Sequence, residues 1–145
     1  MSKFAAVSIA MREKVDYTIY SLEGEPVLVL TQATEVNKPY FNGLLRRSRR
    51  NMPRVKAGNI DVDLVIANRD NDRELYAKHV LCGWKNVRDT KGNEVAFSHE
   101  DALDFLKALP DFIFDEIRDF ASEPRNFVKE QGPDASVVAE TLGED

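Results

Sequence analysis

The clearest alternation of apolar and polar positions lies near the N-terminus. Residues 15–20 are mostly β-branched or aromatic, residues 23–26 contain turn residues, and residues 27–30 are wholly apolar. β-branched and aromatic residues favour strands, while glycine favours a tight turn. Pro26 has no N–H to donate, which suits the first position of a strand. The pattern predicts a β-hairpin over residues 15–31.

A helical pattern follows the hairpin. Thr34 or Asn37 can cap this helix, and Pro39 falls in its first turn, where the missing N–H is harmless. The next apolar residues recur at helical spacing and lead into an arginine-rich segment. Because proline disrupts a helix interior, we expect the helix to end before Pro53 and a loop to cover residues 54–60.

The segment 60–67 allows two interpretations. Apolar residues alternate with Asp61 and Asp63, which favours a strand. The adjoining Val65 and Ala67 also allow a buried helical turn. Both alternatives stay open.

The next helix signal is a capping box. Asn71 is followed three residues later by Glu74, and one apolar face continues until Gly83. Residues 84–87 and 94–97 then flank a turn that contains Gly92. We therefore predict a helix of about twelve residues and a second small hairpin over residues 84–97.

The last two helices have the clearest signals. Ser98 precedes an amphipathic segment that Pro110 ends. Asp111 can cap the next helix, whose expected buried residues are Ile113, Ile117, Phe120 and Ala121. Phe112 falls off this apolar stripe, so it is either packed in the turn or exposed as a contact residue.

Together these elements predict a mainly α (α+β) fold, a helical domain with two small β-hairpins. We expect a single globular domain over residues 1–127 and a flexible acidic tail over residues 128–145, with a possible short helix at 134–142. Residues 3–13 are compatible with a short helix or a third strand.

Composition narrows the class of protein. The 145 residues are 43% hydrophobic and 31% charged, as in an ordinary globular protein, and no apolar run is long enough to span a membrane. Cys82 is the only cysteine, so a reducing cytoplasm is the expected compartment. The net charge of −5 is uneven: residues 1–56 carry +5 and residues 98–145 carry −9. The basic and acidic regions can attract each other within a monomer or between neighbouring copies, and we expect self-association.

The sequence contains no familiar catalytic constellation. It has no nucleophile elbow, and its seven glycines form no phosphate-binding loop. His79 and Cys82 are three residues apart, but too few further ligands exist to complete a tetrahedral metal site. We expect no enzyme activity, no cofactor and no metal.

The strongest local feature is a basic segment from Arg46 to Lys56, with six cations and no acid. Arginines bind phosphates, and Tyr40 and Phe41 nearby suit stacking on bases. Arginines also pair with carboxylates of a protein partner. A nucleic-acid-binding regulator is the alternative function here, although the acidic net charge makes nucleic acid the less favoured partner.

Several stretches resemble the tail assembly chaperones of long-tailed bacteriophages. They are Ala33 to Leu45, His79 to Val87, Gly92, Val95 to Ser98, and Ala102 to Pro110. The resemblance covers roughly residues 26–127. It implies a non-catalytic protein of the host cytoplasm, from a phage or prophage, that is absent from the finished virion.

The same resemblance implies the partners. Such chaperones bind the tape measure protein, help to recruit tail tube subunits, and in some cases form spirals or filaments of repeated copies. The expected partner-binding residues are Tyr40, Phe41, Arg46, Arg47, Arg49, Arg50, Phe112 and Phe114. The expected acidic residues for self-association into a ring, spiral or filament are Asp104, Asp111, Asp115 and Asp119.

Overall fold

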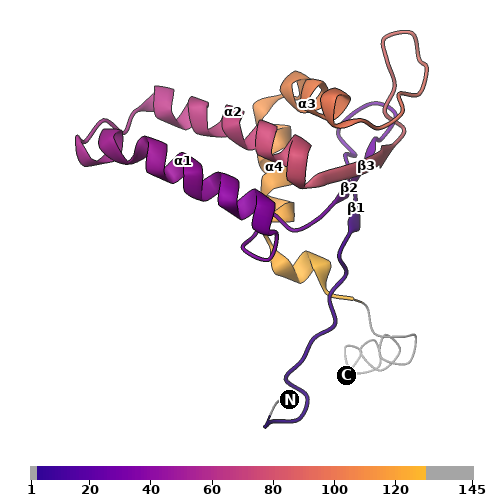
Figure 1. Cartoon of the computed structure of the whole chain (residues 1–145). Coiled ribbons are helices and arrows are strands. Elements are labelled where there is room, and N and C mark those ends of the chain that lie inside the picture. The colour runs from indigo at the N-terminus through magenta and orange to yellow at the C-terminus, as the bar shows by residue number, and fades with distance from the viewer. Residues whose placement is uncertain (1–2, 130–145) are drawn as a thin grey trace, which may run out of the picture.

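The computed structural model describes residues 3–129. In chain order its elements are β1 (Val15–Thr18), β2 (Val27–Leu30), α1 (Lys38–Lys56), α2 (Val62–His79), β3 (Leu81–Lys85), α3 (His99–Ala108), α4 (Asp111–Ala121) and a final 3₁₀ turn, η1 (Pro124–Phe127). The predicted α+β class is confirmed (Figure 1).

A three-stranded antiparallel sheet in the order β1-β2-β3 forms one side of the body. The predicted hairpin over residues 15–31 is confirmed, with Val15 opposite Leu30 and Gly24 at positive φ in the turn. In the central strand β2, Leu28 and Leu30 are fully buried. The sheet therefore presents one apolar face to the helices.

The second predicted hairpin, over residues 84–97, is only partly correct. Its turn forms, with Gly92 at φ +83°, but a single bridge between Arg88 and Glu94 joins its two sides. The strand lies earlier, as β3, and pairs with β2. This arrangement is favoured because it buries Leu81 and gives the second edge of β2 a partner.

Helix α1 begins where the sequence indicates but ends later. The Asn37 side chain accepts a hydrogen bond from the Tyr40 N–H, and its amide donates to the His79 carbonyl oxygen at 2.8 Å. The helix continues through Pro53 to Lys56, so the predicted end was wrong. A proline in the last turn removes one helical hydrogen bond, and the exposed side of the helix tolerates this loss.

Helix α2 is longer than the capping box predicted. It begins at Val62 with Asp61 as its cap, whose side chain accepts from the Leu64 N–H at 3.0 Å. Asn71 and Glu74 therefore lie inside the helix, and the helical alternative for residues 60–67 is correct. The helix ends at His79, four residues before Gly83, because Leu81 already belongs to β3.

Helices α3 and α4 complete the core against α2 and the sheet. Ser98 caps α3 as predicted, whereas Pro110 occupies the N-cap position of α4 and Asp111 is its first residue. Tyr76 and Phe114 are almost completely buried and meet edge to face, with their ring centroids 5.4 Å apart. This aromatic contact joins α2 to α4 at the centre of the body.

The N-terminal segment forms neither of the predicted elements. Met11 makes a β-bridge with Val128, and the Lys129 N–H donates to the Ala10 carbonyl oxygen at 2.8 Å. Residues 128 and 129, predicted to begin a flexible tail, are thus tied to the N-terminal segment. The rest of that tail, including the predicted helix at 134–142, lies outside the described residues.

Candidate partner-binding site

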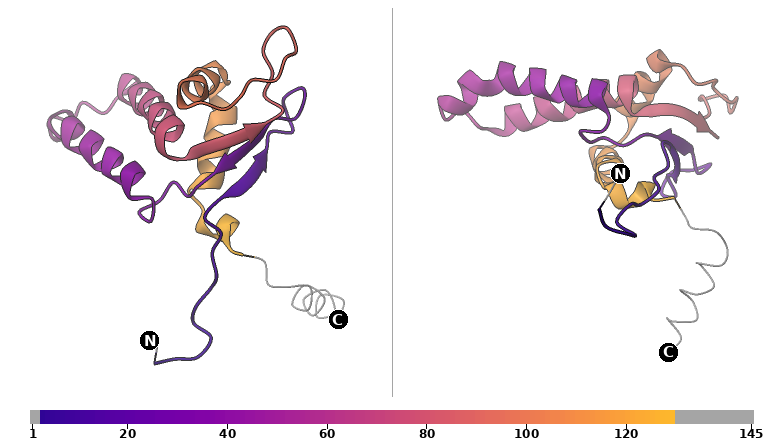
Figure 2. Two further views of the ribbon diagram at one scale, coloured as in Figure 1. Left: turned by 45° about the vertical axis from the view of Figure 1, so that its right-hand side comes forward. Right: turned by 60° about the horizontal axis from the view of Figure 1, so that its bottom comes forward.

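Helices α1 and α2 form an antiparallel pair that projects from the body (Figures 1 and 2). We call residues 38–79 the arm, and its part farthest from the sheet, residues 45–66, the outer arm. The buried residues of α1 are Tyr40 and Gly43, both at the inner end. Among residues 3–129, no further layer covers the outer arm, so its side chains are open to a partner.

Polar contacts hold the two helices of the arm together. Arg47 pairs with Asp72 and also donates to the Asn68 carbonyl oxygen at 3.1 Å. The Asn51 amide donates to the Asn68 side-chain oxygen at 3.0 Å. Such contacts contribute less than apolar packing of the same area, but they fix geometry. The arm is therefore positioned by these polar contacts together with the ring contact between Tyr40 and Tyr76 at its inner end.

A chain of ion pairs ties the arm to α4. Asp72 accepts from Arg118 at 2.8 Å, Arg118 also pairs with Asp115, and Arg69 donates to Asp115 at 3.2 Å. A second branch joins Arg73 to Asp111 at 2.6 Å. Each charged side chain that leaves water thus meets an opposite charge.

These contacts alter the acidity of α4. The hydrogen bond from Arg73 holds the pKa of Asp111 below its usual value, and the charge of Arg69 adds to this effect. Burial acts to raise the pKa of Asp115, but the hydrogen bonds from Arg118 and Arg69 outweigh it and lower that pKa. Both carboxyl groups are therefore ionised in the folded protein at neutral pH.

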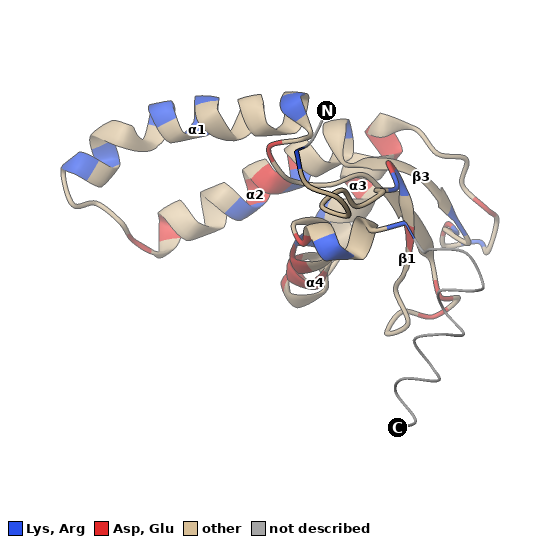
Figure 3. Cartoon of the chain, turned by 90° about the horizontal axis from the view of Figure 1, so that it is seen from below, with Lys and Arg blue, Asp and Glu red and all other residues tan. Residues whose placement is uncertain are grey.

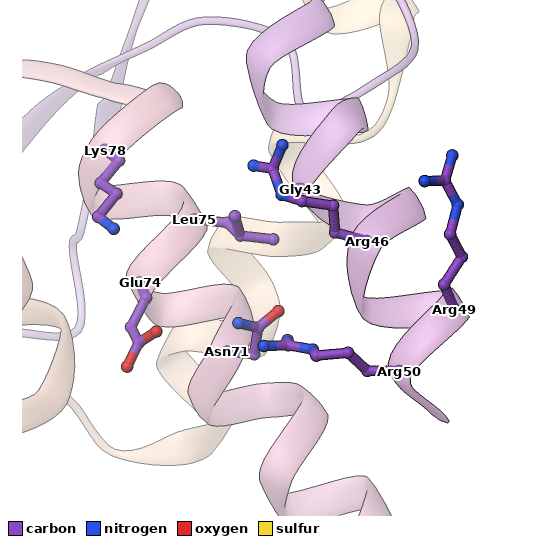
Figure 4. A pocket seen from close by; sticks show the side chains of 8 residues that line it. All are labelled: Gly43, Arg46, Arg49, Arg50, Asn71, Glu74, Leu75 and Lys78. Carbon is purple, nitrogen blue, oxygen red and sulfur yellow. The ribbon is translucent and has the colours of Figure 1, made fainter. Parts of the chain in front are cut away.

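A cationic hollow lies on one side of the arm, between α1 and α2 (Figure 4). Its volume is about 410 Å³, and it is lined by Gly43, Arg46, Arg49, Arg50, Asn71, Glu74, Leu75 and Lys78. Gly43 and Leu75 form an apolar floor, where a Cβ on residue 43 would overlap the Leu75 side chain. The lining carries four cations and one acid, so the hollow attracts anionic groups.

The outer arm also exposes apolar side chains. We call this set the apolar surface of the arm: Leu45, Met52, Val55, Ile60, Val62, Val65 and Ile66. Their exposure ranges from 42% for Met52 to 70% for Val62. Met52 and Val55 line a second hollow, of about 300 Å³, together with Leu44 and Leu64. Clusters of this kind are typical of binding surfaces.

The structure separates the predicted aromatic contacts into buried and exposed residues. Tyr40 is 6% exposed and Phe114 is fully buried, so placing them on a partner-binding surface was wrong. Both belong to the aromatic core around Tyr76. Phe41 is half-buried, and Phe112 is 62% exposed, which selects the exposed alternative for Phe112.

The charged residues predicted to bind partners divide into exposed side chains and side chains that are paired within the chain. Arg46, Arg49 and Arg50 are exposed along α1 (Figure 3), whereas Arg47 is engaged with Asp72. Asp111 and Asp115 already pair with arginines of their own chain, so they are not free acids for a neighbouring copy. Asp104 and Asp119 are exposed and form no ion pair with any residue between 3 and 129.

Sequence reasoning missed the apolar surface of the arm. A usable signal exists, because Val62, Val65 and Ile66 recur at the i, i+3, i+4 spacing of a helix. The strand alternative for residues 60–67 obscured it, and the expected helix end at Pro53 separated Met52 from Val55. Both groups belong to the outer arm, one on α1 and the other on α2.

The cysteine and one of the two histidines of the sequence have structural contacts. His99 Nδ1 lies 2.8 Å from the Ala77 carbonyl oxygen, and the Cys82 thiol donates to the Val29 carbonyl oxygen. Across residues 3–129, no three His, Cys, Asp or Glu side chains are grouped closely enough to hold a metal ion. The helices in that range also include none with both the length and the apolar character needed to cross a bilayer.

Comparison with known families connects this architecture to a viral origin. Residues 36–136, more than two thirds of the chain, match the family described as YdaY prophage protein. The chain belongs to this family. The match includes the whole arm, β3, α3 and α4, whereas the β1–β2 hairpin lies before it. Neither a curated protein nor a solved structure gives a significant match.

Proposed function

We propose that this prophage protein is a non-catalytic tail assembly chaperone. In this proposal the arm binds the tape measure protein and keeps it soluble, and the complex helps to recruit tail tube subunits in the host cytoplasm. The finished virion does not retain the chaperone. The observation that carries the proposal is the exposure of the apolar side chains of the outer arm, none of which is less than 42% exposed in the set from Leu45 to Ile66 named above.

The form of this surface suits a helical client. The resemblance to tail assembly chaperones implies that the client is a long helix with apolar positions along it. An amphipathic helix binds by placing residues at i, i+3, i+4 and i+7 into an apolar groove. The second hollow lies between the two helices, and its apolar lining residues suit these positions: Leu44, Met52, Val55 and Leu64. Its remaining lining residues are polar: Arg47, Ser48, Asn51 and Asn68. Nearby arginines keep the loaded complex soluble.

Co-expression with a tape measure protein from the same prophage tests this proposal. The variant Met52→Ser with Val55→Ser should lower the amount of soluble tape measure protein that is recovered with the chaperone. Because both side chains are more than 40% exposed, its melting temperature should change little. A matched control is Val7→Ser with Ile9→Ser, which removes two exposed apolar side chains outside the arm. Equal recovery with both double variants would contradict the proposal.

A nucleic-acid-binding regulator is the second candidate, and the cationic hollow favours it. Arg46, Arg49, Arg50 and Lys78 surround this hollow and suit phosphate groups. The engagement of Arg47 with Asp72 and the net charge of −5 oppose it. Binding to a DNA duplex that falls steeply with salt, and that Arg46→Ala with Arg50→Ala abolishes, would support this candidate over the chaperone.

A further inference from the structure

The outer face of α4 carries an exposed aromatic residue among acids. Phe112, Glu116 and Asp119 stand at i, i+4 and i+7, so they share one face of the helix. All three are exposed, and Phe112 is 62% exposed. The neighbouring cation, Arg118, turns away from this face to pair with Asp72 and Asp115. The face therefore presents an apolar ring flanked by two negative charges.

The cationic hollow has the complementary properties. Its floor is formed by Gly43 and by Leu75, which packs closely against Gly43 because that residue has no side chain. Its rim carries Arg46, Arg49, Arg50 and Lys78 together with one acid, Glu74 (Figure 4). An aromatic ring packs well on such a floor, and arginine side chains stack on aromatic faces. Carboxylates beside the ring would meet the cations of the rim.

We propose that the cationic hollow of one copy receives the outer face of α4 from a second copy, with Phe112 as the central residue of the contact. Glu116 and Asp119 then lie opposite Arg46, Arg50 and Lys78 of the neighbour. This contact replaces the predicted pairing through Asp111 and Asp115, which are engaged within their own chain. It does not depend on which client the arm binds.

The two surfaces face different directions on one molecule. The α4 residues Ile113, Phe114 and Ile117 pack inward, so Phe112 and its acidic neighbours face away from the core. On α2, Glu74 and Lys78 lie on the opposite side of the helix from Asp72, which contacts α4. Figure 2 shows α4 beneath the layer of the arm. A contact between two different surfaces is heterologous, so it extends into a ring or an open stack.

Sedimentation velocity of the full chain tests this contact. The wild-type protein should associate as its concentration rises, and high salt should weaken the association because charges flank the ring. Phe112→Ser with Glu116→Gln removes the inserted face, and Arg46→Glu with Arg50→Glu reverses the rim. Each double variant should associate at least about tenfold more weakly than wild type, since it alters the centre of the contact.

Mixing the two double variants gives the sharpest result. The first variant keeps an intact hollow and the second keeps an intact α4 face, so an equimolar mixture should form one-to-one dimers and no larger species. Glu23→Arg, in the exposed β1–β2 turn, is the control for a changed surface charge and should associate as wild type does. Circular dichroism and thermal melting of every variant show that it is folded.

Three results would overturn the proposal. The first is a wild-type protein that stays monomeric up to its solubility limit at low salt. The second is a double variant that associates as strongly as wild type. The third is a mixture of the two folded variants that stays monomeric. The chaperone proposal is tested separately, by the recovery of soluble tape measure protein with the variant Met52→Ser, Val55→Ser. A failure of one proposal can therefore be told apart from a failure of the other.

Discussion

The inner and outer halves of α2 belong to one helix but meet different surroundings. In the inner half, Leu75, Tyr76 and Ala77 are 7% exposed or less, because α3, α4 and the sheet cover them. In the outer half, Val62 and Val65 are more than half exposed, although they are as apolar as the inner residues. Hydrophobicity alone therefore does not separate core from surface in this chain.

The two regions are also stabilised by different kinds of interaction. The body is held by apolar and aromatic packing around Tyr76 and Phe114. Beyond the inner end that contributes Tyr40 and Tyr76 to this core, the arm is held by hydrogen bonds and ion pairs, such as Arg47 with Asp72. Apolar burial drives folding more strongly than solvent-accessible polar pairs do. Stability should therefore reside in the body, while the outer arm is left available for binding.

The largest predicted effect compares a side chain from each region. Phe114→Ala removes a fully buried ring and should lower the free energy of unfolding by about 3–5 kcal/mol. Val65→Ala, on the outer arm, should lower it by less than about 0.5 kcal/mol because the side chain is already 54% exposed. Urea unfolding of both variants measures the difference. Similar losses would show that the outer arm is packed as tightly as the body.

Sequence reasoning found the elements whose signals are local. The first hairpin, the Ser98 cap and the break at Pro110 each depend on residues within a few positions of one another. The helix boundaries of the arm were harder to predict, because two local signals pointed to the wrong residues. Pro53 suggested a helix end, and Asn71 with Glu74 imitated a helix start inside α2. Asp61 provides the actual cap, and only the complete fold shows this.

The candidate site could be predicted only in part for a related reason. Exposure of Arg46, Arg49 and Arg50 follows from their spacing on α1, but the engagement of Arg47 depends on Asp72, which lies 25 positions away. Phe112 and Phe114 are close in sequence yet lie on opposite sides of α4. Phe114 shares the inward face with Ile117 and Ala121 at i+3 and i+7, a spacing that sequence analysis could have used.

The second prediction concerns the charge that links arm and body. Asp72→Asn leaves Arg47 and Arg118 without their shared carboxylate, whose side chain is 9% exposed. Loss of hydrogen bonds to a charged group costs about 1.5–3 kcal/mol, so urea unfolding should report a loss of this size. Amide hydrogen exchange should accelerate more in α1 than in β2, because the arm loses its attachment.

Asp70→Asn is the matched control for this variant. Asp70 also pairs with an arginine, Arg73 at 3.1 Å, but its side chain is 66% exposed. Exposed ion pairs contribute about 0–1 kcal/mol, so this control should cost less than Asp72→Asn. Equal losses in the free energy of unfolding for the two variants, or an equal acceleration of amide hydrogen exchange throughout the chain, would show that Asp72 does not link the arm to the body.

The smallest predicted effect is a dependence on pH at the junction of α4 and the arm. Hydrogen bonding from Arg73 lowers the pKa of Asp111 in the folded protein relative to its usual value of 3.8. A lowered folded-state pKa stabilises the protein above pH 3.8, and this contribution is lost as the pH falls through the folded-state value.

Thermal melting should therefore show a slightly lower melting temperature for Asp111→Asn than for wild type at neutral pH. The two curves should approach each other as the pH falls from 3.8 through the lower folded-state pKa, because wild-type Asp111 is protonated below that value as well. Curves that stay parallel down to acid pH would show that the contact with Arg73 adds no stability through the charge of Asp111.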